Sequence, residues 1–345
     1  MSERIENIIV IGDTHFGVRN NSMTWLKHQK AGFEEIIKYV DNTKRSYDFI
    51  RIIHVGDLFD SRSSINPLVW REVVNLLTQL DKVMEGYPCQ MDIIGGNHDY
   101  YYPWETERNF TGIEMLPSFK NIHTIVNNAL ILDNLLLIPW FTFHNKKLLK
   151  IAMDTFSRTT PNGGIIFTHT DPFHMDPEIK NLISGHRLIT GHIHQPYYSE
   201  DGNLLVTGAT YPIDFTDTNS QRGFWTITRE YDTKKIINIE FRAVHSSIHF
   251  HTITEEALEN WEELGIQEDD YVEILIKQSH VSDHEKTIKK LVDLFGATTT
   301  PLPEENNIIF ESTEVLNVDS VCRKMLPEKL KGPYQQMVEA LSKKE

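Results

Sequence analysis

The sequence contains very little cysteine and has no long uninterrupted hydrophobic run. Its 345 residues include two cysteines, Cys89 and Cys322, which lie far apart and outside any CxxC motif. That spacing disfavours both a disulfide framework and a thiolate metal site. The most apolar stretch, 129–143, is broken by Asp133 and Pro139, and the polar start of the chain does not resemble a signal peptide. We therefore expect a cytoplasmic protein without a membrane span.

Basic residues are also scarce relative to acidic ones. The chain has 34 Lys and Arg against 49 Asp and Glu, a net charge of −15. From Ser246 onward there are 20 acidic and 10 basic residues, which leaves 29 acidic and 24 basic residues before it. No basic patch is visible in the sequence, although phosphate contacts normally dominate binding to nucleic acid. A phosphate-rich ligand would therefore need bound cations or a partner protein to be held.

The composition, with 40% hydrophobic and 24% charged residues, is that of a globular protein, and the length suggests one large and one smaller domain. Strand-like and helix-like stretches alternate in the first half, which indicates an α/β layout. We expect strands at 7–11, 49–55 and 91–94, and helices at 23–40 and 66–84. Further strands are expected at 122–126, 129–132, 165–168, 188–190, 204–207, 223–228 and 236–241, with a helix at 146–156. Two facing sheets with helices outside would bury these runs, so we predict a four-layer αββα sandwich.

After about residue 244 the pattern changes to that of a small α+β domain. Strands are expected at 249–254, 271–276 and 308–310, helices at 255–264 and 283–295, and a loop at 297–307, before a helical segment at 314–343. We therefore divide the chain into a main domain (1–244), a capping domain (245–312) and a helical tail (313–345).

Five groups of polar residues follow apparent strands. They are GDTH at 12–15, GDLFD at 56–60, GGNHD at 95–99, His169, and GHIH at 191–194. Loops at the carboxyl ends of strands converge on one crevice in open α/β sheets, so these groups can meet. Imidazoles and carboxylates with one amide oxygen suit divalent metals such as manganese or iron. Two metals that share a carboxylate can clamp a phosphate for in-line attack by water.

Each motif taken alone has a simpler explanation. A Gly-Asp pair after a strand is usually a turn, and Asp-x-His is weak on its own. The ordered set of five motifs is far more specific than any member, which favours a metal-dependent phosphoesterase.

The five motifs resemble those of the calcineurin-like metallophosphoesterase superfamily over about residues 7–242. Within it, GDLFD followed by Pro67, GHIHQP followed by GAT at 208–210, and RGFW at 222–225 resemble the SbcD and meiotic-recombination-eleven nucleases. The likeness is greatest to the recombination endonucleases of T-even-like phages. The resemblance implies a DNA exonuclease and endonuclease that serves double-strand-break repair and recombination.

The resemblance also implies a role for each motif residue. One metal would be held by Asp13, His15 and His194, the other by Asn97, His169 and His192, with Asp57 as the bridge and His98 facing the scissile phosphate. The expected cofactors are two divalent ions, Mn²⁺ above all, with Mg²⁺ or Fe²⁺ as alternatives. These roles suit the residue types, because an anionic Asp57 can bridge two cations and a neutral Asn97 leaves its metal electrophilic.

At Asp60 the sequence departs from the eukaryotic and archaeal members, which carry a histidine three residues after the bridging aspartate. An exposed aspartate is ionised at neutral pH and is a poor proton donor. We therefore predict that Asp60 supports catalysis by orienting His98 or His15 through its carboxylate. The alternative is that it caps the following helix or turn.

Two other functions stay open at this point. Protein phosphatases of the superfamily usually show GDxxDRG and GNHE, whereas this chain has GDLFDSR and GNHD followed by the tyrosines 100–102. Those tyrosines could stack on bases or simply pack. An inactive DNA-binding scaffold would be expected to lack metal ligands, and none is missing.

The expected partners are DNA, in the form of duplex ends and single strands, a second copy of the chain, and an SbcC-like coiled-coil ATPase. An apolar line of Trp70, Val74 and Leu77 beside the main stripe of its helix favours a homodimer, or burial within the fold. The apolar residues of the tail favour docking to the ATPase, or coverage of the chain's own domain.

Overall fold

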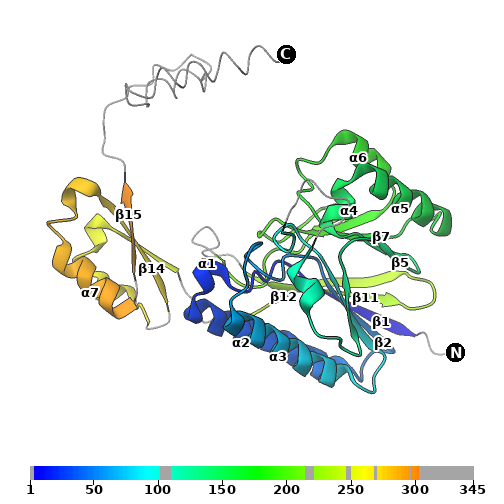
Figure 1. Cartoon of the computed structure of the whole chain (residues 1–345), viewed down its shortest axis with the longest axis horizontal. Helices are drawn as coiled ribbons and strands as arrows, with labels where there is room; N and C mark the ends of the chain where they lie inside the picture. The colour runs from blue at the N-terminus through cyan, green and yellow to red at the C-terminus, as the bar shows by residue number, and fades with distance from the viewer. Residues whose placement is uncertain are drawn as a thin grey trace, which may run out of the picture.

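The computed structural model describes residues 4–101, 110–213, 221–245, 250–267, 270–295 and 297–302. Two six-stranded sheets form the main body, and a separate three-stranded sheet follows toward the C-terminus (Figure 1). The α/β fold predicted from the sequence is therefore confirmed.

The first sheet is mostly parallel, with an antiparallel pair at one side. Its order is β12 (Ile236–Ala243), β11 (Gly223–Glu230), β1 (Ile5–Ile11), β2 (Phe49–His54), β3 (Cys89–Ile94) and β4 (Ile122–Ile125). Strands β1 to β4 run parallel, so the loops after β1, β2 and β3 emerge at the same edge.

The second sheet has a parallel centre between two antiparallel edge strands. Its order is β5 (Leu130–Leu132), β6 (Leu135–Leu137), β7 (Ile165–His169), β8 (Arg187–Gly191), β10 (Leu204–Val206) and β9 (Tyr197–Tyr198). Because β7 and β8 are parallel neighbours in register, His169 lies opposite Gly191 at their carboxyl ends.

Alternating side chains of the strands supply three stacked cores. In β1, Ile9 and Ile11 belong to the core shared with α2 and α3, whereas Ile8 and Val10 belong to the core between the sheets. In β7, Ile166 belongs to a third core, under α5 and α6. The alternation follows from the period of two along a strand. The layers are thus helix, sheet, sheet and helix.

The helices begin where their sequences provide caps. Asn66 accepts a hydrogen bond from the N–H of Leu68 at 2.8 Å, and Pro67 opens the helix that follows.

Each sheet is covered by helices on its outer face. The first sheet is covered by α2 (Met23–Thr43) and α3 (Pro67–Met84), and the short α1 (Val18–Asn21) precedes them. The second sheet is covered by α4 (Trp140–His144), α5 (Lys146–Thr159) and α6 (Pro177–Leu182). The 3₁₀ turn η1 (Gly112–Met115) precedes β4.

The three-stranded sheet toward the C-terminus is parallel and has its own core. It contains β13 (Phe250–Thr254), β14 (Tyr271–Lys277) and β15 (Thr298–Leu302), with α7 (Glu285–Phe295) and the 3₁₀ turns η3 (Glu255–Ala257), η4 (Trp261–Leu264) and η5 (Gln278–His280). Its contact with the main body includes Trp25 of α2, whose ring centroid lies 5.5 Å from that of Phe250 and 5.7 Å from that of Tyr271.

Several expectations from the sequence were wrong in detail. The segment 255–264 forms two 3₁₀ turns rather than one helix, and the predicted loop at 297–307 begins with strand β15. The β-branched run of three threonines favours a strand, and Pro301 is tolerated because β15 lies at the sheet edge. Strand β6 was missed because Asp133 takes a left-handed φ of 54° and splits one apolar run into the hairpin β5–β6.

The described residues contain no helix that is both long and apolar enough to span a membrane. The expected strand at 308–310 and the helical tail lie outside the described residues, and the domain boundaries at 244 and 312 stay predictions.

Candidate metal centre

The ends of five strands bring the predicted metal ligands together. Asp13 and His15 follow β1, Asp57 follows β2, Asn97 follows β3, His169 ends β7, and His192 and His194 follow β8. The first five of these are buried, and the last two are half-buried. Three overlapping groups among these residues and His98 have ligand atoms within 4.8 Å of one another. The structure therefore contains clusters of residues that could hold metal ions.

One cluster consists of Asp13, His15 and His194. Nε2 of His15 lies 4.0 Å from Oδ1 of Asp13, and the ring centroids of His15 and His194 are 5.1 Å apart. Nε2 of His15 is buried without a hydrogen-bond partner. Buried polar atoms normally have a partner, so this nitrogen suggests a ligand at this position.

Asn97, His169 and His192 form the opposite side of the centre. Oδ1 of Asn97 lies 2.9 Å from Nε2 of His169 and 2.9 Å from Nδ1 of His192. On its other side, His169 places Nδ1 2.9 Å from the carbonyl oxygen of Val55. A proton on Nδ1 would be donated to that oxygen and would leave the Nε2 lone pair for a cation, as is common for histidine ligands.

Asp57 lies between the two sides. Its Oδ2 is 3.5 Å from Nε2 of His15 and 3.2 Å from Nε2 of His169, while its Oδ1 accepts a hydrogen bond from the N–H of His98 at 2.8 Å. One carboxylate oxygen thus faces ligands from both halves. This is the position that a bridging residue requires.

The backbone at these positions is strained. Asp13, His15, Asp57 and His192 have φ angles of 30°, 40°, 53° and 81°, in the left-handed region that favours glycine. Such conformations cost on the order of 1–3 kcal/mol each and persist only where the surroundings hold them. The strain therefore coincides with the candidate ligands.

Gln29, Tyr211 and Thr210 of the GAT segment hold the strained loop after β1, and the sequence analysis did not identify the first two. Nε2 of Gln29 donates to the backbone oxygens of Thr14 at 3.0 Å and His15 at 2.7 Å. The hydroxyl of Tyr211 also donates to the Thr14 oxygen, and Thr210 donates to the oxygen of Gly12 at 2.7 Å. Gln29 and Tyr211 belong to no motif, because their role depends on backbone atoms remote in sequence.

Asp99 was also missed as a structural residue, although it ends the GGNHD motif. Its carboxylate accepts hydrogen bonds from the backbone N–H groups of Gly96 at 2.9 Å and Phe59 at 3.2 Å. It thereby joins the loops after β2 and β3. A Cβ on Gly96 would lie 2.3 Å from the backbone nitrogen of Asp57, so only glycine permits this approach.

The electrostatics of the centre show a shortage of positive charge. Burial raises the pKa of Asp13 to about 7, although His169 lowers it in part. Burial also opposes ionisation of Asp57, but the adjacent His169 and His15 hold its pKa below the ordinary value. In spite of its own burial, His169 has a pKa raised to about 9 by Asp57. Among the described residues no Lys or Arg forms an ion pair with either carboxylate, so divalent cations suit this set of donors.

His98 lies beside this centre and is half-buried. Its Nδ1 is 2.6 Å from the backbone oxygen of Asp60, and its ring centroid is 4.9 Å from that of His15. The carboxylate of Asp60 instead approaches Nδ1 of His15, at 3.3 Å. The structure therefore places both predicted catalytic residues against the candidate ligands.

Tyr100 does not offer a surface for base stacking. It is fully buried, and its hydroxyl donates to the backbone oxygen of Val126. Tyr101 is 48% exposed, and residue 102 lies outside the described residues. Of the two alternatives, stacking on bases or packing, Tyr100 follows the second, because its ring fills the space against Gly95.

Comparison with known proteins bears on this centre. The model of the family described as calcineurin-like phosphoesterase matches residues 6–204. No curated protein matches the chain.

Three solved structures illustrate the structural likeness. Nuclease MPE of Pseudomonas putida is 16% identical, with 63% of this chain and 83% of that chain covered and a TM-score of 0.29. The 5′-nucleotidase precursor of Thermus thermophilus is 11% identical, with 70% and 54% covered and a TM-score of 0.38. A conserved uncharacterised protein of Streptococcus pneumoniae, a predicted phosphoesterase, is 12% identical, with 70% and 100% covered and a TM-score of 0.27. At these TM-scores the likenesses carry no argument about substrate.

Proposed function

The chain belongs to the calcineurin-like phosphoesterase family, and from this premise we propose that it is a metal-dependent DNA nuclease. It would hydrolyse phosphodiester bonds at strand ends and within single strands, as a subunit of a complex for double-strand-break repair and recombination. The proposal is carried by the positions of the GAT and RGFW segments, which resemble those of SbcD-like nucleases. Both segments lie against the loop of the candidate metal centre that carries His192 and His194.

Those segments hold the loop that carries His192 and His194. Arg222 of the RGFW motif donates a hydrogen bond to the backbone oxygen of His194, and the N–H of Ala209 donates to the same oxygen at 2.8 Å. The indole N–H of Trp225 donates to the oxygen of Thr207 at 3.1 Å. The residues that distinguish the nuclease-like motifs thus support the centre directly, which favours a nuclease over a phosphatase.

We assign the ligands as the motifs indicate. One cation would be held by Asp13, His15 and His194, a second by Asn97, His169 and His192, with Asp57 shared. The oxygen and nitrogen donors suit Mn²⁺, and also Mg²⁺ or Fe²⁺. Two such ions, when bound, would polarise a phosphoryl oxygen and lower the pKa of water.

His98 is the residue assigned to the reacting phosphate. Its Nδ1 can donate to the backbone oxygen of Asp60 at 2.6 Å, which directs Nε2 away from that contact. Nε2 can then hold a proton for the oxygen that leaves phosphorus. The Asp60 carboxylate supports a neighbouring histidine, His15, and does not itself supply a proton.

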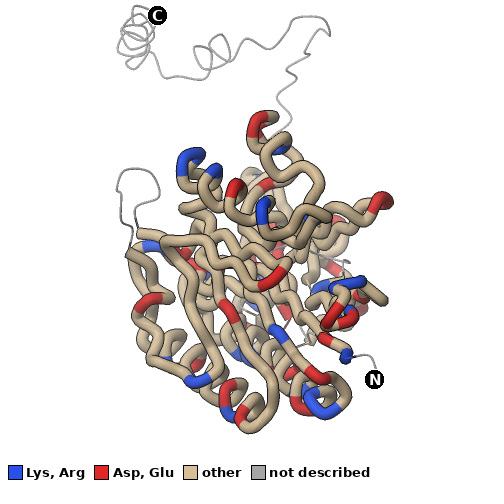
Figure 2. The backbone as a smooth tube through the Cα atoms, turned by 90° about the vertical axis from the view of Figure 1, so that its right-hand side faces the viewer, with Lys and Arg blue, Asp and Glu red and all other residues tan. Residues whose placement is uncertain are grey.

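The charge of the chain favours a partner in DNA binding. Lys and Arg are scattered among Asp and Glu over the described backbone in the view of Figure 2, and the net charge is −15. An SbcC-like ATPase that binds the tail at 313–345 would supply the missing cationic surface. A homodimer through α3 is a weaker proposal, because Leu77 is buried and the ring of Trp70 stacks on Phe59 with centroids 5.8 Å apart.

The test is cleavage of labelled DNA by the purified chain, with and without Mn²⁺ and with and without the ATPase. Duplex ends and single strands are compared with a phosphopeptide at equal concentration. Manganese-dependent cleavage of DNA is the expected result. Hydrolysis of the phosphopeptide alone would favour a protein phosphatase, and hydrolysis of neither would favour a scaffold.

A further inference from the structure

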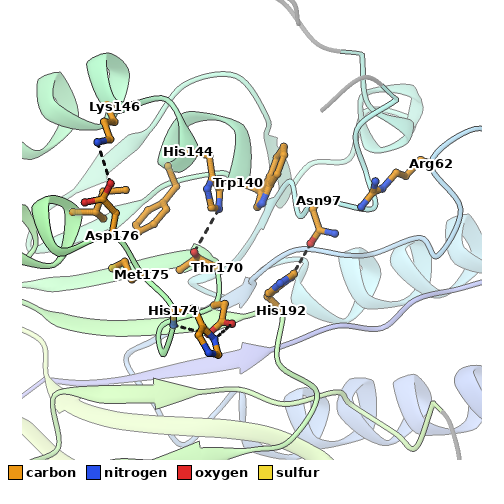
Figure 3. A pocket seen from close by; sticks show the side chains of 13 residues that line it. Arg62, Asn97, Trp140, His144, Lys146, Thr170, His174, Met175, Asp176 and His192 are labelled. Atoms are coloured by element: carbon orange, nitrogen blue, oxygen red, sulfur yellow. Dashed lines mark hydrogen bonds and ion pairs between the residues drawn. The ribbon is translucent and has the colours of Figure 1, made fainter. Parts of the chain in front are cut away.

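A cavity of about 570 Å³ lies beside the candidate metal centre (Figure 3). Asn97 and His192, two of the assigned ligands, line it together with residues of α4, α6 and the loop after β7. Pockets for small organic ligands span about 300–1,000 Å³. The cavity therefore has room for more than a phosphate, namely for a group attached to the phosphate at the centre.

The wall formed by α4 is aromatic. Trp140 and His144 both line the cavity, and their ring centroids are 5.0 Å apart with an interplanar angle of 42°. Trp140 is buried and His144 is exposed, so His144 is the ring that a ligand can reach. The backbone N–H of Trp140 donates to the oxygen of Gly95 at 2.8 Å, which ties this wall to the loop that carries Asn97. Aromatic rings are the usual platforms for nucleobases. A phosphorylated serine or threonine brings no ring to such a wall.

The charges at the α6 side of the cavity are already paired. Nζ of Lys146 lies 3.0 Å from Asp176 and 2.7 Å from Glu178, and Nδ1 of His174 lies 2.8 Å from Asp171. The three carboxylates outnumber the one lysine on this side. A second phosphate would be repelled from this side.

Lys146 is ion-paired, whereas Arg62 forms no ion pair within the described part of the chain. It lines the same cavity, and Figure 3 shows its side chain on the side of Asn97. An unpaired guanidinium there can meet the charge of one phosphate at the metal centre. The cavity is thus cationic at the end near the centre and acidic at the other.

We propose that this cavity binds the terminal nucleoside of a DNA strand, with its base against His144 and its single phosphodiester at the metal centre. The proposal rests on the nuclease function proposed above and names the feature that would favour strand ends. An internal nucleotide carries phosphates on both sides, and one of them would meet Asp171 and Asp176. Hydrolysis adds water to phosphorus and breaks one P–O bond, so a mononucleotide leaves.

The first test uses the full chain with Mn²⁺ and single-stranded oligonucleotides. Each carries either thymidine or a tetrahydrofuran abasic residue at one terminus, and both termini are examined in turn. Release of the terminal residue should be about tenfold slower for the abasic strand at the end that is attacked, because one stacked base is lost.

The second test changes the aromatic wall. His144→Ala removes the ring and should lower the ratio of thymidine to abasic rates from about ten to about one, whereas His144→Phe keeps a ring and should keep the ratio. His186→Ala is the matched control: that ring lies 5.1 Å from the ring of Phe156 under the same helical layer, but it does not line the cavity. Its ratio should equal that of the wild-type chain.

Two results would overturn the inference while leaving the nuclease function intact. They are equal rates on thymidine and abasic ends, or an unchanged ratio in His144→Ala. If the wild-type chain cleaves neither oligonucleotide yet hydrolyses bis(p-nitrophenyl) phosphate with Mn²⁺, the nuclease function fails and the nucleoside assignment fails with it.

Discussion

A carboxylate oxygen of Asp60 lies 3.3 Å from Nδ1 of His15. His15 is buried at 3% exposure, and its Nε2 faces Asp57 at 3.5 Å. A carboxylate against Nδ1 favours a proton on that nitrogen and leaves the Nε2 lone pair for a cation. The alternative, in which Asp60 caps the next helix, does not hold for α3, because Asn66 is the capping residue there.

Replacement of Asp60 by Ala should therefore weaken metal binding and activity about 10 to 100-fold, with little loss of stability. High Mn²⁺ should restore most of the activity, because the backbone oxygen that contacts His98 remains. Asp60→Asn serves as the matched variant, since it keeps the size but not the charge. Single-turnover cleavage across a Mn²⁺ titration, together with thermal melting, measures both effects. Full activity with a lowered melting temperature would contradict the assignment.

His98→Ala should leave both metals bound but lower cleavage at least about 100-fold, the scale of a lost general acid. The reason is that His98 is not an assigned ligand: its backbone N–H donates to Oδ1 of Asp57, which the substitution preserves, and its Nδ1 faces the backbone oxygen of Asp60. Elemental analysis counts the metals, and added Mn²⁺ should not rescue the rate. Loss of metal from this variant would show that His98 is a ligand.

Asp57→Ala should lower the occupancy of both metal positions together, because its carboxylate faces His15 and His169 at once. Asp57→Asn is the matched variant of equal size, and it should retain metal only weakly since a neutral amide cannot balance two cations. Metal content per chain, measured after gel filtration, is the readout. Two ions retained in Asp57→Ala would place the bridge elsewhere.

Much of the fold could be predicted from local patterns. The alternation in β1, with Ile9 facing one core and Ile8 the other, follows from strand geometry and was visible in the sequence. The edges were harder to predict. β15 carries Pro301, and β6 continues the apolar run that was predicted as the strand β5, so neither β15 nor β6 was predicted.

The candidate ligands could be recognised because each follows a strand and adjoins a characteristic motif. Their supports could not be recognised in this way. Gln29 acts on the backbone oxygens of Thr14 and His15, and Tyr211 reaches the first of these from 197 positions away. Contacts of side chains to remote backbone atoms leave no periodic signal, so only the folded chain reveals them.

Truncation after Ser312 should spare manganese-dependent cutting of single strands and abolish assembly with the ATPase, if the tail is the docking element. The main sheets and the candidate centre lie before this point, so the chemistry should persist. Co-purification of a tagged full-length chain with the ATPase is the positive control. Equal recovery of the ATPase with the truncated chain would refute docking through the tail.

Gln29→Leu should lower both stability and metal affinity, because it removes the two hydrogen bonds that hold the backbone of Thr14 and His15. The loss of stability should be about 1–3 kcal/mol, the cost of leaving buried carbonyl groups unpaired. Metal affinity should fall as well, since His15 has a φ of 40° that the loop cannot keep unaided.

Gln79→Leu is the matched control, because Gln79 is exposed on α3 and should change neither quantity. Melting curves with EDTA isolate the stability term, and Mn²⁺ titrations at a temperature well below melting isolate the affinity. A destabilised Gln29→Leu protein with unchanged Mn²⁺ affinity would show that Gln29 supports the fold alone and that other contacts, such as that of Tyr211, maintain the strained loop.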